Sequence, residues 1–280
     1  MKTMRHRQGW ADSAGALRLY WQAWLPADEP LAVVVLHHGA GEHSGRYPHA
    51  VAQLVAAGYG VYGLDARGHG RSGGRRASFD RFEQLTTDLH TVVSQAIPRA
   101  RELPVFLLGY SLGGAVVVAY ALEHQDELAG AIVIGSALGR GSGVSRTQFG
   151  MASLLSAIAP RVPLIRLRAT DLTGDPAVAE KYEADPLVHH GRLDARMLGE
   201  VATVMRRLPA HFHRIRLPLL LIHGDADVTA SPEGSRALLH GARSPDKTLK
   251  LYQGRRHDVL NEPGHEQVMV DITTWLAVHH

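Results

Sequence analysis

Short apolar runs rich in β-branched side chains recur along the chain. They occupy residues 32–38, 60–65, 104–110, 129–135, 217–223 and 248–252. Within each run the apolar residues are continuous rather than alternating with polar ones, which is typical of strands buried on both faces of a parallel sheet. We therefore expect a mostly parallel sheet that is covered by helices on both sides.

Segments with helical periodicity separate these runs. They occupy residues 47–57, 79–101, 112–124, 232–240 and 266–278. Strands that alternate with helices in this way predict a doubly wound α/β fold. The two opening segments, 2–10 and 17–25, alternate apolar and polar residues instead. We expect them to form an antiparallel hairpin at the edge of the sheet.

The alternation stops between residues 138 and 217. This stretch has helical patches and prolines at positions 160, 163, 176, 186 and 209, but no segment that predicts a strand. An interruption that returns to the same strand pattern is typical of an insertion into one domain. We predict an α/β core formed by residues 1–137 and 211–280, with a mainly helical cap of residues 138–210 over the functional site.

Residues 149–160 of the predicted cap form an apolar stretch without charged residues. The stretch contains Met151, Leu154, Leu155 and Ile158, and arginines follow at positions 161, 166 and 168. An apolar helix with basic flanks can lie on a membrane surface or offer an entrance to lipids. Packing of the cap onto the core explains the same pattern, and the sequence leaves both interpretations open.

The composition is that of a globular protein and excludes several kinds of chemistry. The chain has 280 residues, 45% hydrophobic and 20% charged, and can bury one large core. It contains no cysteine, which excludes disulfides, thiolate metal sites and a catalytic thiol and favours a cytoplasmic location. The first ten residues are polar, unlike a secretory signal, and no apolar run reaches the roughly 20 residues of a membrane-spanning helix.

Charge and histidine content do not indicate nucleic-acid or metal binding. The formal net charge is +3, but the arginines are scattered among acidic residues rather than gathered in a basic stripe. Among the 18 histidines, neighbouring pairs such as His189 with His190, and His211 with His213, lack the spacing of metal ligands. We expect no metal ion, no cofactor and no nucleic-acid partner.

A candidate nucleophile lies between a predicted strand and a predicted helix. The sequence GYSLG at 109–113 fits the pattern G-x-S-x-G, in which the serine occupies a strained turn after a strand. The flanking glycines are needed because side chains there would collide with the neighbouring backbone. We assign Ser111 as a nucleophile and infer a serine hydrolase.

A serine hydroxyl is a weak nucleophile near neutral pH, so a base must take its proton and a third group must orient that base. In folds with this turn the chain order is serine, acid, histidine. Asp225 and Asp227 both follow a predicted strand. We favour Asp227 as the acid and Asp225 as a turn residue, with the reverse assignment left open. His257 precedes the last predicted helix, so it is a better candidate for the base than His240 or His265.

Hydrolysis of an ester also needs N–H donors for the oxyanion that forms on the carbonyl carbon. Leu112 directly follows the nucleophile and should supply one backbone N–H. The sequence HHGA at 37–40 follows a predicted strand, and its glycine permits close approach. We assign the second donor to the N–H of Ala40, although a tight turn between strand and helix explains the same residues.

Four segments add a family resemblance. They are HGAGEHSGRY at 38–47, DARGHGRS at 65–72, LLGYSLGG at 107–114 and YEADPL at 182–187. In these motifs, and over nearly its whole length, the chain resembles the monoacylglycerol lipases, a lysophospholipase-like branch of the α/β-hydrolases. The resemblance implies the same triad and oxyanion donors and no cofactor.

The resemblance also implies that Glu42, Arg46 and Tyr182 bind a glycerol head group, while the apolar face of the cap receives the acyl chain. A surface ion pair near a helix start is the alternative for Glu42 and Arg46. Two residues depart from the family pattern: Tyr110 stands where histidine is usual, and Leu260 stands where animal members have a second histidine. Both departures concern the head-group pocket rather than the triad.

The expected function is hydrolysis of monoacylglycerol to fatty acid and glycerol through an acyl-enzyme. Lysophospholipase or general carboxylesterase activity would use the same triad and is the first alternative. A noncatalytic α/β-hydrolase that only binds ligands is the second. The expected partner is a small lipid ester, with peripheral membrane contact through the cap left open. The sequence does not distinguish a monomer from a homodimer.

Overall fold

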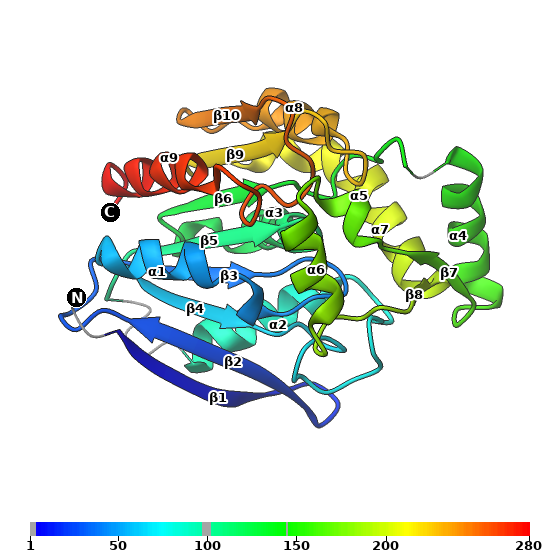
Figure 1. The fold of residues 1–280 in the computed structure, drawn as a ribbon, viewed down its shortest axis with the longest axis horizontal. Helices are drawn as coiled ribbons and strands as arrows, with labels where there is room; N and C mark the ends of the chain where they lie inside the picture. Colours follow the sequence, from blue (N-terminus) through cyan, green and yellow to red (C-terminus); the bar gives the residue numbers. More distant parts are fainter. Residues whose placement is uncertain (1–3, 97–101, 144) are drawn as a thin grey trace.

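The computed structural model describes residues 4–96, 102–143 and 145–280. Its centre is an eight-stranded sheet with the order β1-β2-β4-β3-β5-β6-β9-β10 (Figure 1). The strands are β1 (Arg5–Ser13), β2 (Leu17–Leu25), β3 (Val33–His37), β4 (Gly60–Leu64), β5 (Val105–Tyr110), β6 (Gly130–Ile134), β9 (Leu219–Gly224) and β10 (Lys247–Tyr252).

The six strands from β4 to β10 in this order pair in parallel, whereas β1 and β2 form an antiparallel pair at one edge. Every residue of β3, β4, β5, β6 and β9 is buried, as expected for continuous apolar runs. The predicted α/β fold is therefore confirmed. The edge hairpin is also present, although residues 2 and 3 lie outside the described part of the chain.

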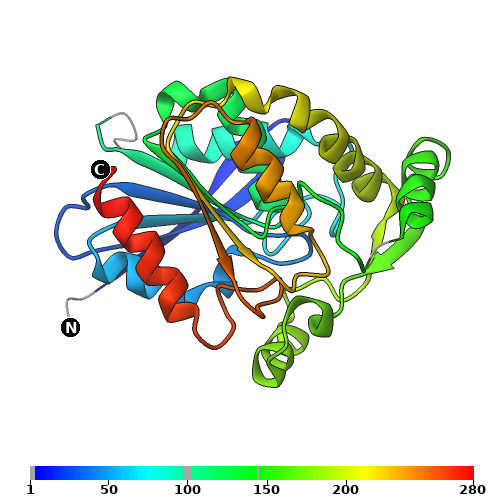
Figure 2. The same ribbon diagram turned by 90° about the horizontal axis from the view of Figure 1, so that it is seen from above.

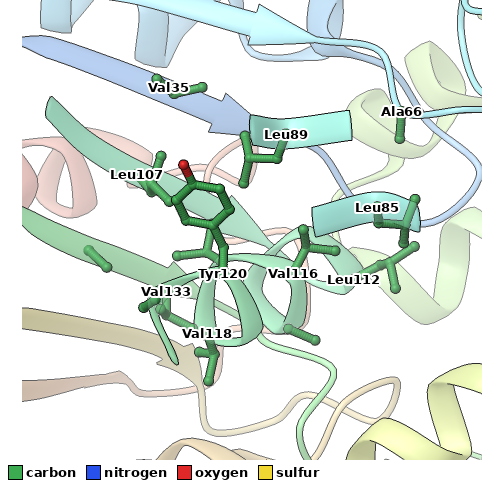
Figure 3. Close-up of a cluster of buried hydrophobic side chains, with 14 of the residues drawn as sticks. Val35, Ala66, Leu85, Leu89, Leu107, Leu112, Val116, Val118, Tyr120 and Val133 are labelled. Carbon is green, nitrogen blue, oxygen red and sulfur yellow. The ribbon is translucent and has the colours of Figure 1, made fainter. Parts of the chain in front are cut away.

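Helices cover both faces of the sheet (Figure 2). One face carries α1 (Pro48–Ala56) and α9 (His265–Ala277), which contact each other, and the other carries α2 (Glu83–Ala96), α3 (Leu112–His124) and α8 (Pro232–Gly241). Each layer has its own apolar core. On the α3 side, Val35 and Leu107 of the strands lie near Val116 of α3 and Leu89 of α2 (Figure 3). These two cores hold the strand ends in fixed positions.

Helix α2 begins four residues later than the predicted segment 79–101. The side-chain oxygen of Gln84 accepts hydrogen bonds from the N–H groups of Asp80 and Arg81 at 3.0 and 3.1 Å. These bonds hold a turn before the first helical residue, Glu83. The last five predicted residues, 97–101, lie outside the described part of the chain.

The predicted cap, residues 138–210, lies beyond the carboxyl ends of β3, β5 and β6, where their arrowheads point (Figure 1). It contains α4 (Arg146–Ile158), β7 (Pro163–Arg166), α5 (Ala169–Leu172), α6 (Pro176–Ala184), β8 (Arg192–Asp194) and α7 (Ala195–Arg207), followed by the 3-10 helix η3 (Leu208–Arg214). The expectation that this segment has no strand was wrong, because β7 and β8 pair antiparallel. These strands are short, and β7 is partly or fully exposed along its length, so neither carries an apolar run that marks a strand in the sequence.

Candidate active site

The turn between β5 and α3 exposes Ser111 at the end of a buried strand. Ser111 has a φ of +54°, which is strained for a residue with a side chain. A Cβ atom on Gly109 would lie 2.3 Å from the carbonyl oxygen of Gly113, and one on Gly113 would lie 2.1 Å from that of His37. The two glycines therefore permit the tight turn that the motif predicts.

Three residues from separate loops meet at this turn. Nε2 of His257 lies 2.8 Å from Oγ of Ser111, and Nδ1 of the same ring lies 2.6 Å from Oδ2 of Asp227. Since a carboxylate only accepts, Nδ1 carries the ring proton and Nε2 is left to accept the serine proton. The structure thus brings the predicted nucleophile, base and acid into one hydrogen-bonded chain.

The carboxylate of Asp227 is held by backbone donors as well. Its Oδ1 accepts hydrogen bonds from the N–H groups of Thr229 and Ala230 at 2.8 and 2.9 Å. Burial alone would raise the pKa of Asp227, but the adjacent His257 and His223 hold the pKa well below its usual value. Asp225, the alternative acid, is exposed and accepts a hydrogen bond from the N–H of Gly254 at 2.7 Å. That contact fits the turn role expected for it.

His257 is buried among negative charges. Burial alone would lower the pKa of His257, but Asp227, Asp258 and Glu42 raise the pKa above its usual value. A base with a pKa nearer the working pH takes a proton more effectively. The electrostatics therefore suit proton transfer from Ser111.

The loop after β3 also lies close to Ser111. A Cβ atom on Gly39 would lie 3.0 Å from Cβ of Ser111 and 2.5 Å from Oε1 of Glu42, so glycine favours this close approach. In the described part of the chain, no acceptor takes the N–H of Ala40 or of Leu112, the first residue of α3. The N–H groups of both predicted oxyanion donors are therefore unengaged, one on the residue after Ser111 and the other on the residue after Gly39.

Three buried histidines pack beneath the loop that follows β3, and His38 contacts it directly. His38 sits between the loop and the strand end: its Nδ1 lies 2.7 Å from the carbonyl oxygen of Gly39, and its Nε2 accepts the N–H of Ala66 at 2.9 Å. His37 and His69 lie next to it, with ring centroids 5.6 and 5.3 Å from that of His38. Burial lowers the pKa of His37 and of His69 to about 4. Burial also lowers the pKa of His38 well below its usual value, so all three rings are neutral near pH 7.

The predicted head-group residues form a buried ion cluster. Arg46 pairs with the carboxylate of Glu42 and lies 3.2 Å from Oδ2 of Asp258. The guanidinium of Arg46 also stacks 4.7 Å from the ring centroid of Tyr182, which α6 supplies. The side chains of Arg46 and Glu42 are only 7% and 4% exposed. The structure therefore brings Glu42, Arg46 and Tyr182 together, and the alternative of a surface ion pair is wrong.

Two phenols next to this cluster are buried without a partner. Within the described residues, no group hydrogen-bonds to the hydroxyl of Tyr110 or of Tyr182. The charges of Glu42, Arg46 and Asp258 act on both phenols, so both hydroxyls lie close to the same ions. A buried hydroxyl without a partner costs free energy, which a polar ligand would recover.

Comparison with known proteins gives the family. The profile of the family described as "Serine aminopeptidase, S33" matches residues 28–264. The monoacylglycerol lipase of Mycolicibacterium smegmatis is 38% identical and covers 95% of each chain. The monoglyceride lipase of Rattus norvegicus is 33% identical over 92% of this chain and 86% of its own length. The chain belongs to the monoacylglycerol lipase family.

A solved structure from the monoacylglycerol lipase family has the same fold. The crystal structure of the Paleococcus ferrophilus monoacylglycerol lipase matches this chain with a TM-score of 0.83 and 30% identity, covering 99% of this chain and 100% of that one. The family resemblance inferred from the four motifs, and the α/β-hydrolase fold that it implies, are therefore confirmed.

Residues of the predicted cap are hydrogen-bonded to the loop that follows β3. The N–H of His189 donates to the carbonyl oxygen of Gly41 at 2.7 Å. Nδ1 of His43 accepts the N–H of Gly45, so Nε2 carries the proton and donates to Asp185 at 2.9 Å. The segment 185–189 therefore fixes the loop that carries Ala40.

An apolar stripe lies exposed on α4 and the turn after it. Met151, Leu154 and Ile158 are 55%, 64% and 71% exposed, and Val162 is 38% exposed. The spacing of three and four residues places Met151, Leu154 and Ile158 on one face of α4. In the described part of the chain, no helix is both long enough and apolar enough to cross a lipid bilayer.

One group of described residues could hold a metal ion. His90, His124 and Glu127 place ligand atoms within 4.8 Å of one another. His124 ends α3, whose first residue follows Ser111, so thirteen residues at about 1.5 Å each separate the group from the nucleophile. The two imidazoles stack at 4.6 Å, and this group has no part in the triad.

Two residues at the site were not assigned a role from the sequence. Asp258 binds Arg46 from a position 212 residues away, a contact that no local pattern reveals. His223 contacts the carboxylate of Asp227 from the end of β9. The sequence places His223 four residues before the acid, but a histidine in an apolar strand is equally expected as a structural residue.

Proposed function

We propose that this chain hydrolyses monoacylglycerols through an acyl-enzyme on Ser111. The observation that carries the proposal is the continuous chain of hydrogen bonds from Ser111 through His257 to Asp227, at 2.8 and 2.6 Å. His257 takes the hydroxyl proton through Nε2 as Oγ attacks the ester carbonyl carbon. The imidazolium then gives that proton to the leaving alkoxide, so glycerol departs and the acyl group stays on Ser111.

The second half of the reaction uses the same groups. A water molecule gives a proton to His257 and attacks the acyl carbon, and the proton returns to Ser111 as the fatty acid leaves. In both halves the N–H groups of Ala40 and Leu112 donate to the oxyanion. Asp227 stays ionised and holds the ring of His257 in the required tautomer.

The residues of the proposed head-group pocket favour a neutral polyol as the head group of the substrate. Arg46 is already paired with Glu42 and Asp258, so it offers no unbalanced positive charge to the phosphate of a lysophospholipid. The unpartnered hydroxyls of Tyr110 and Tyr182 suit the hydroxyls of glycerol. The names of the M. smegmatis and rat relatives point to the same substrate. A noncatalytic binding protein would have no need for an engaged base and acid.

We also propose that residues 138–210 act as the cap and bring a cytoplasmic enzyme to lipid surfaces. The exposed stripe of Met151, Leu154 and Ile158 supports this role. Replacing Leu154 and Ile158 with serine should reduce binding to phospholipid vesicles and activity on emulsified substrate, while activity on a dissolved ester stays unchanged. Ala157→Ser, an exposed change on the same helix, is the matched control. Equal vesicle binding by all variants would contradict membrane contact.

The test of the function is a comparison of head groups. Fatty acid release is measured from monoacylglycerol, diacylglycerol, lysophosphatidylcholine and a short p-nitrophenyl ester, for the native chain and for Ser111→Ala. We expect preferred turnover of monoacylglycerol that Ser111→Ala abolishes. Better turnover of another ester would keep the mechanism and change the substrate. Activity that survives Ser111→Ala would contradict the triad, and no activity on any ester would favour the binding protein.

A further inference from the structure

A second imidazole contacts the carboxylate of Asp227. His223 lies at the end of β9 and is completely buried. Its Nε2 lies 3.1 Å from Oδ2 of Asp227 and 3.1 Å from the carbonyl oxygen of Ala230. Oδ2 is also the atom that faces Nδ1 of His257. Asp227 is therefore placed between two histidine rings.

The proton position on His223 follows from its partners. The carbonyl oxygen of Ala230 can only accept, and the ionised carboxylate of Asp227 can only accept, so Nε2 of His223 carries a proton. Nδ1 lies 2.8 Å from Oγ of Ser235 on α8. Ser235 is fully buried, and when the ring proton is on Nε2 its hydroxyl is placed to donate to Nδ1. Ser235 thus selects the tautomer that donates to the acid.

With these contacts the carboxylate of Asp227 accepts four hydrogen bonds. Oδ1 accepts two backbone N–H groups, and Oδ2 accepts one N–H from His257 and one from His223. A carboxylate with four donors cannot rotate without losing hydrogen bonds to a charged group, each worth about 1.5–3 kcal/mol. The orientation of Asp227, and through it that of His257, is therefore fixed by contacts on both carboxylate oxygens.

We propose that His223 is a positioning residue for the triad, which holds Asp227 in place and shares its negative charge with His257. This inference rests on the proposed function, because it assumes that His257 activates Ser111. If His223 stops donating, the whole charge of Asp227 acts on His257, which then holds its proton more tightly. The other groups that face His257 are Asp258, Glu42 and the ring of Tyr110, which lies 5.1 Å away, and the substitutions below change none of them.

The test uses the rate at which a fluorophosphonate labels Ser111, measured from pH 5.5 to 9. This probe reports the activated serine whatever the ester preference of the enzyme. His223→Leu removes the donor with little change of volume, and we expect labelling at pH 7 to slow about tenfold, the effect of one lost hydrogen bond to a charged group. We also expect the midpoint of the pH profile to move to higher pH.

Two further variants separate positioning from general damage. His223→Gln can place an amide N–H near the position of Nε2, so it should restore most of the rate and the original midpoint. Ser235→Ala should slow labelling less than His223→Leu does, with a shift in the same direction. Ser244→Ala is the matched control, since Ser244 is buried and hydrogen-bonded to Asp246 at the opposite ends of β9 and β10. It should change neither the rate nor the midpoint.

Each outcome decides one question. A midpoint unchanged in His223→Leu, or a loss that His223→Gln does not repair in a folded protein, would overturn the role of His223. If His223→Leu fails to fold, the midpoint of Ser235→Ala decides instead, and a profile identical to that of the native chain overturns the proposal. Absence of labelling in the native chain would contradict the triad itself. Turnover of an ester other than monoacylglycerol would change the proposed substrate and leave the His223 result standing.

Discussion

Glu42 and Gly39 are joined by a hydrogen bond from the N–H of Gly39 to Oε1 of Glu42, at 3.1 Å. The other carboxylate oxygen of Glu42 pairs with Arg46. One buried side chain therefore connects the ion cluster of the proposed head-group pocket to the loop that carries Ala40. Loss of Glu42 should disturb the proposed oxyanion hole as well as that pocket.

We predict that Glu42→Ala lowers kcat on every ester, including a p-nitrophenyl ester with no glycerol. The expected loss is about tenfold to a hundredfold, smaller than the loss of an oxyanion donor. Glu42→Gln keeps an acceptor for Gly39 and should retain most of the kcat on the p-nitrophenyl ester. Steady-state kinetics on both esters check this. A change confined to KM for monoacylglycerol would show that Glu42 acts on the head group alone.

The pH dependence of hydrolysis should reflect His257. Its pKa is raised above the usual value, because the negative charges of Asp227, Asp258 and Glu42 outweigh burial. Only the neutral ring accepts a proton, so kcat/KM should rise with pH through a midpoint above 6.5. Asp227→Asn removes the nearest charge, so burial should move this midpoint to lower pH. It should also cut kcat by about 10⁴-fold, because the wrong tautomer of His257 then faces Ser111. A midpoint that stays in place would assign the titration to another group.

The sequence predicted the parts of the fold that depend on buried strands and short motifs. The apolar runs gave the order of strand and helix because each run is continuous, and the glycines around Ser111 marked its turn. The sequence did not predict β7 and β8, because both strands are short and every residue of β7 is partly or fully exposed. Arg46 and Asp258 are 212 residues apart in the sequence. No local pattern predicts their contact, which only the folded structure reveals.

Buried histidines should make the fold sensitive to acid. Burial lowers the pKa of His37 and of His69 to about 4, below the ordinary 6.5 of the unfolded chain. Between these values the unfolded state binds protons that the folded state does not. The free energy of unfolding is therefore highest above pH 6.5 and falls as the pH drops towards 4.

For each of these histidines the loss between pH 7 and pH 5 should be about 2 kcal/mol. The variant His69→Asn keeps a donor for the carbonyl oxygen of Arg67, which Nδ1 of His69 contacts at 2.8 Å, but it cannot be protonated. Its free energy of unfolding should fall less steeply with acid than that of the native chain. Urea unfolding at several pH values measures both slopes. Identical slopes would exclude His69 as a source of the acid sensitivity.

The phenol of Tyr110 offers a direct test of the head-group pocket. Its hydroxyl is buried and has no hydrogen-bond partner among the described residues, so Tyr110→Phe removes an unpartnered group and should leave the melting temperature unchanged or slightly higher. If the hydroxyl binds glycerol, KM for monoacylglycerol should rise about fivefold to tenfold, the cost of one hydrogen bond, while a p-nitrophenyl ester is unaffected. Tyr59→Phe is the control, because Tyr59 is equally buried and its hydroxyl contacts His280 instead. Equal kinetics of Tyr110→Phe and the native chain on both esters would place the glycerol elsewhere.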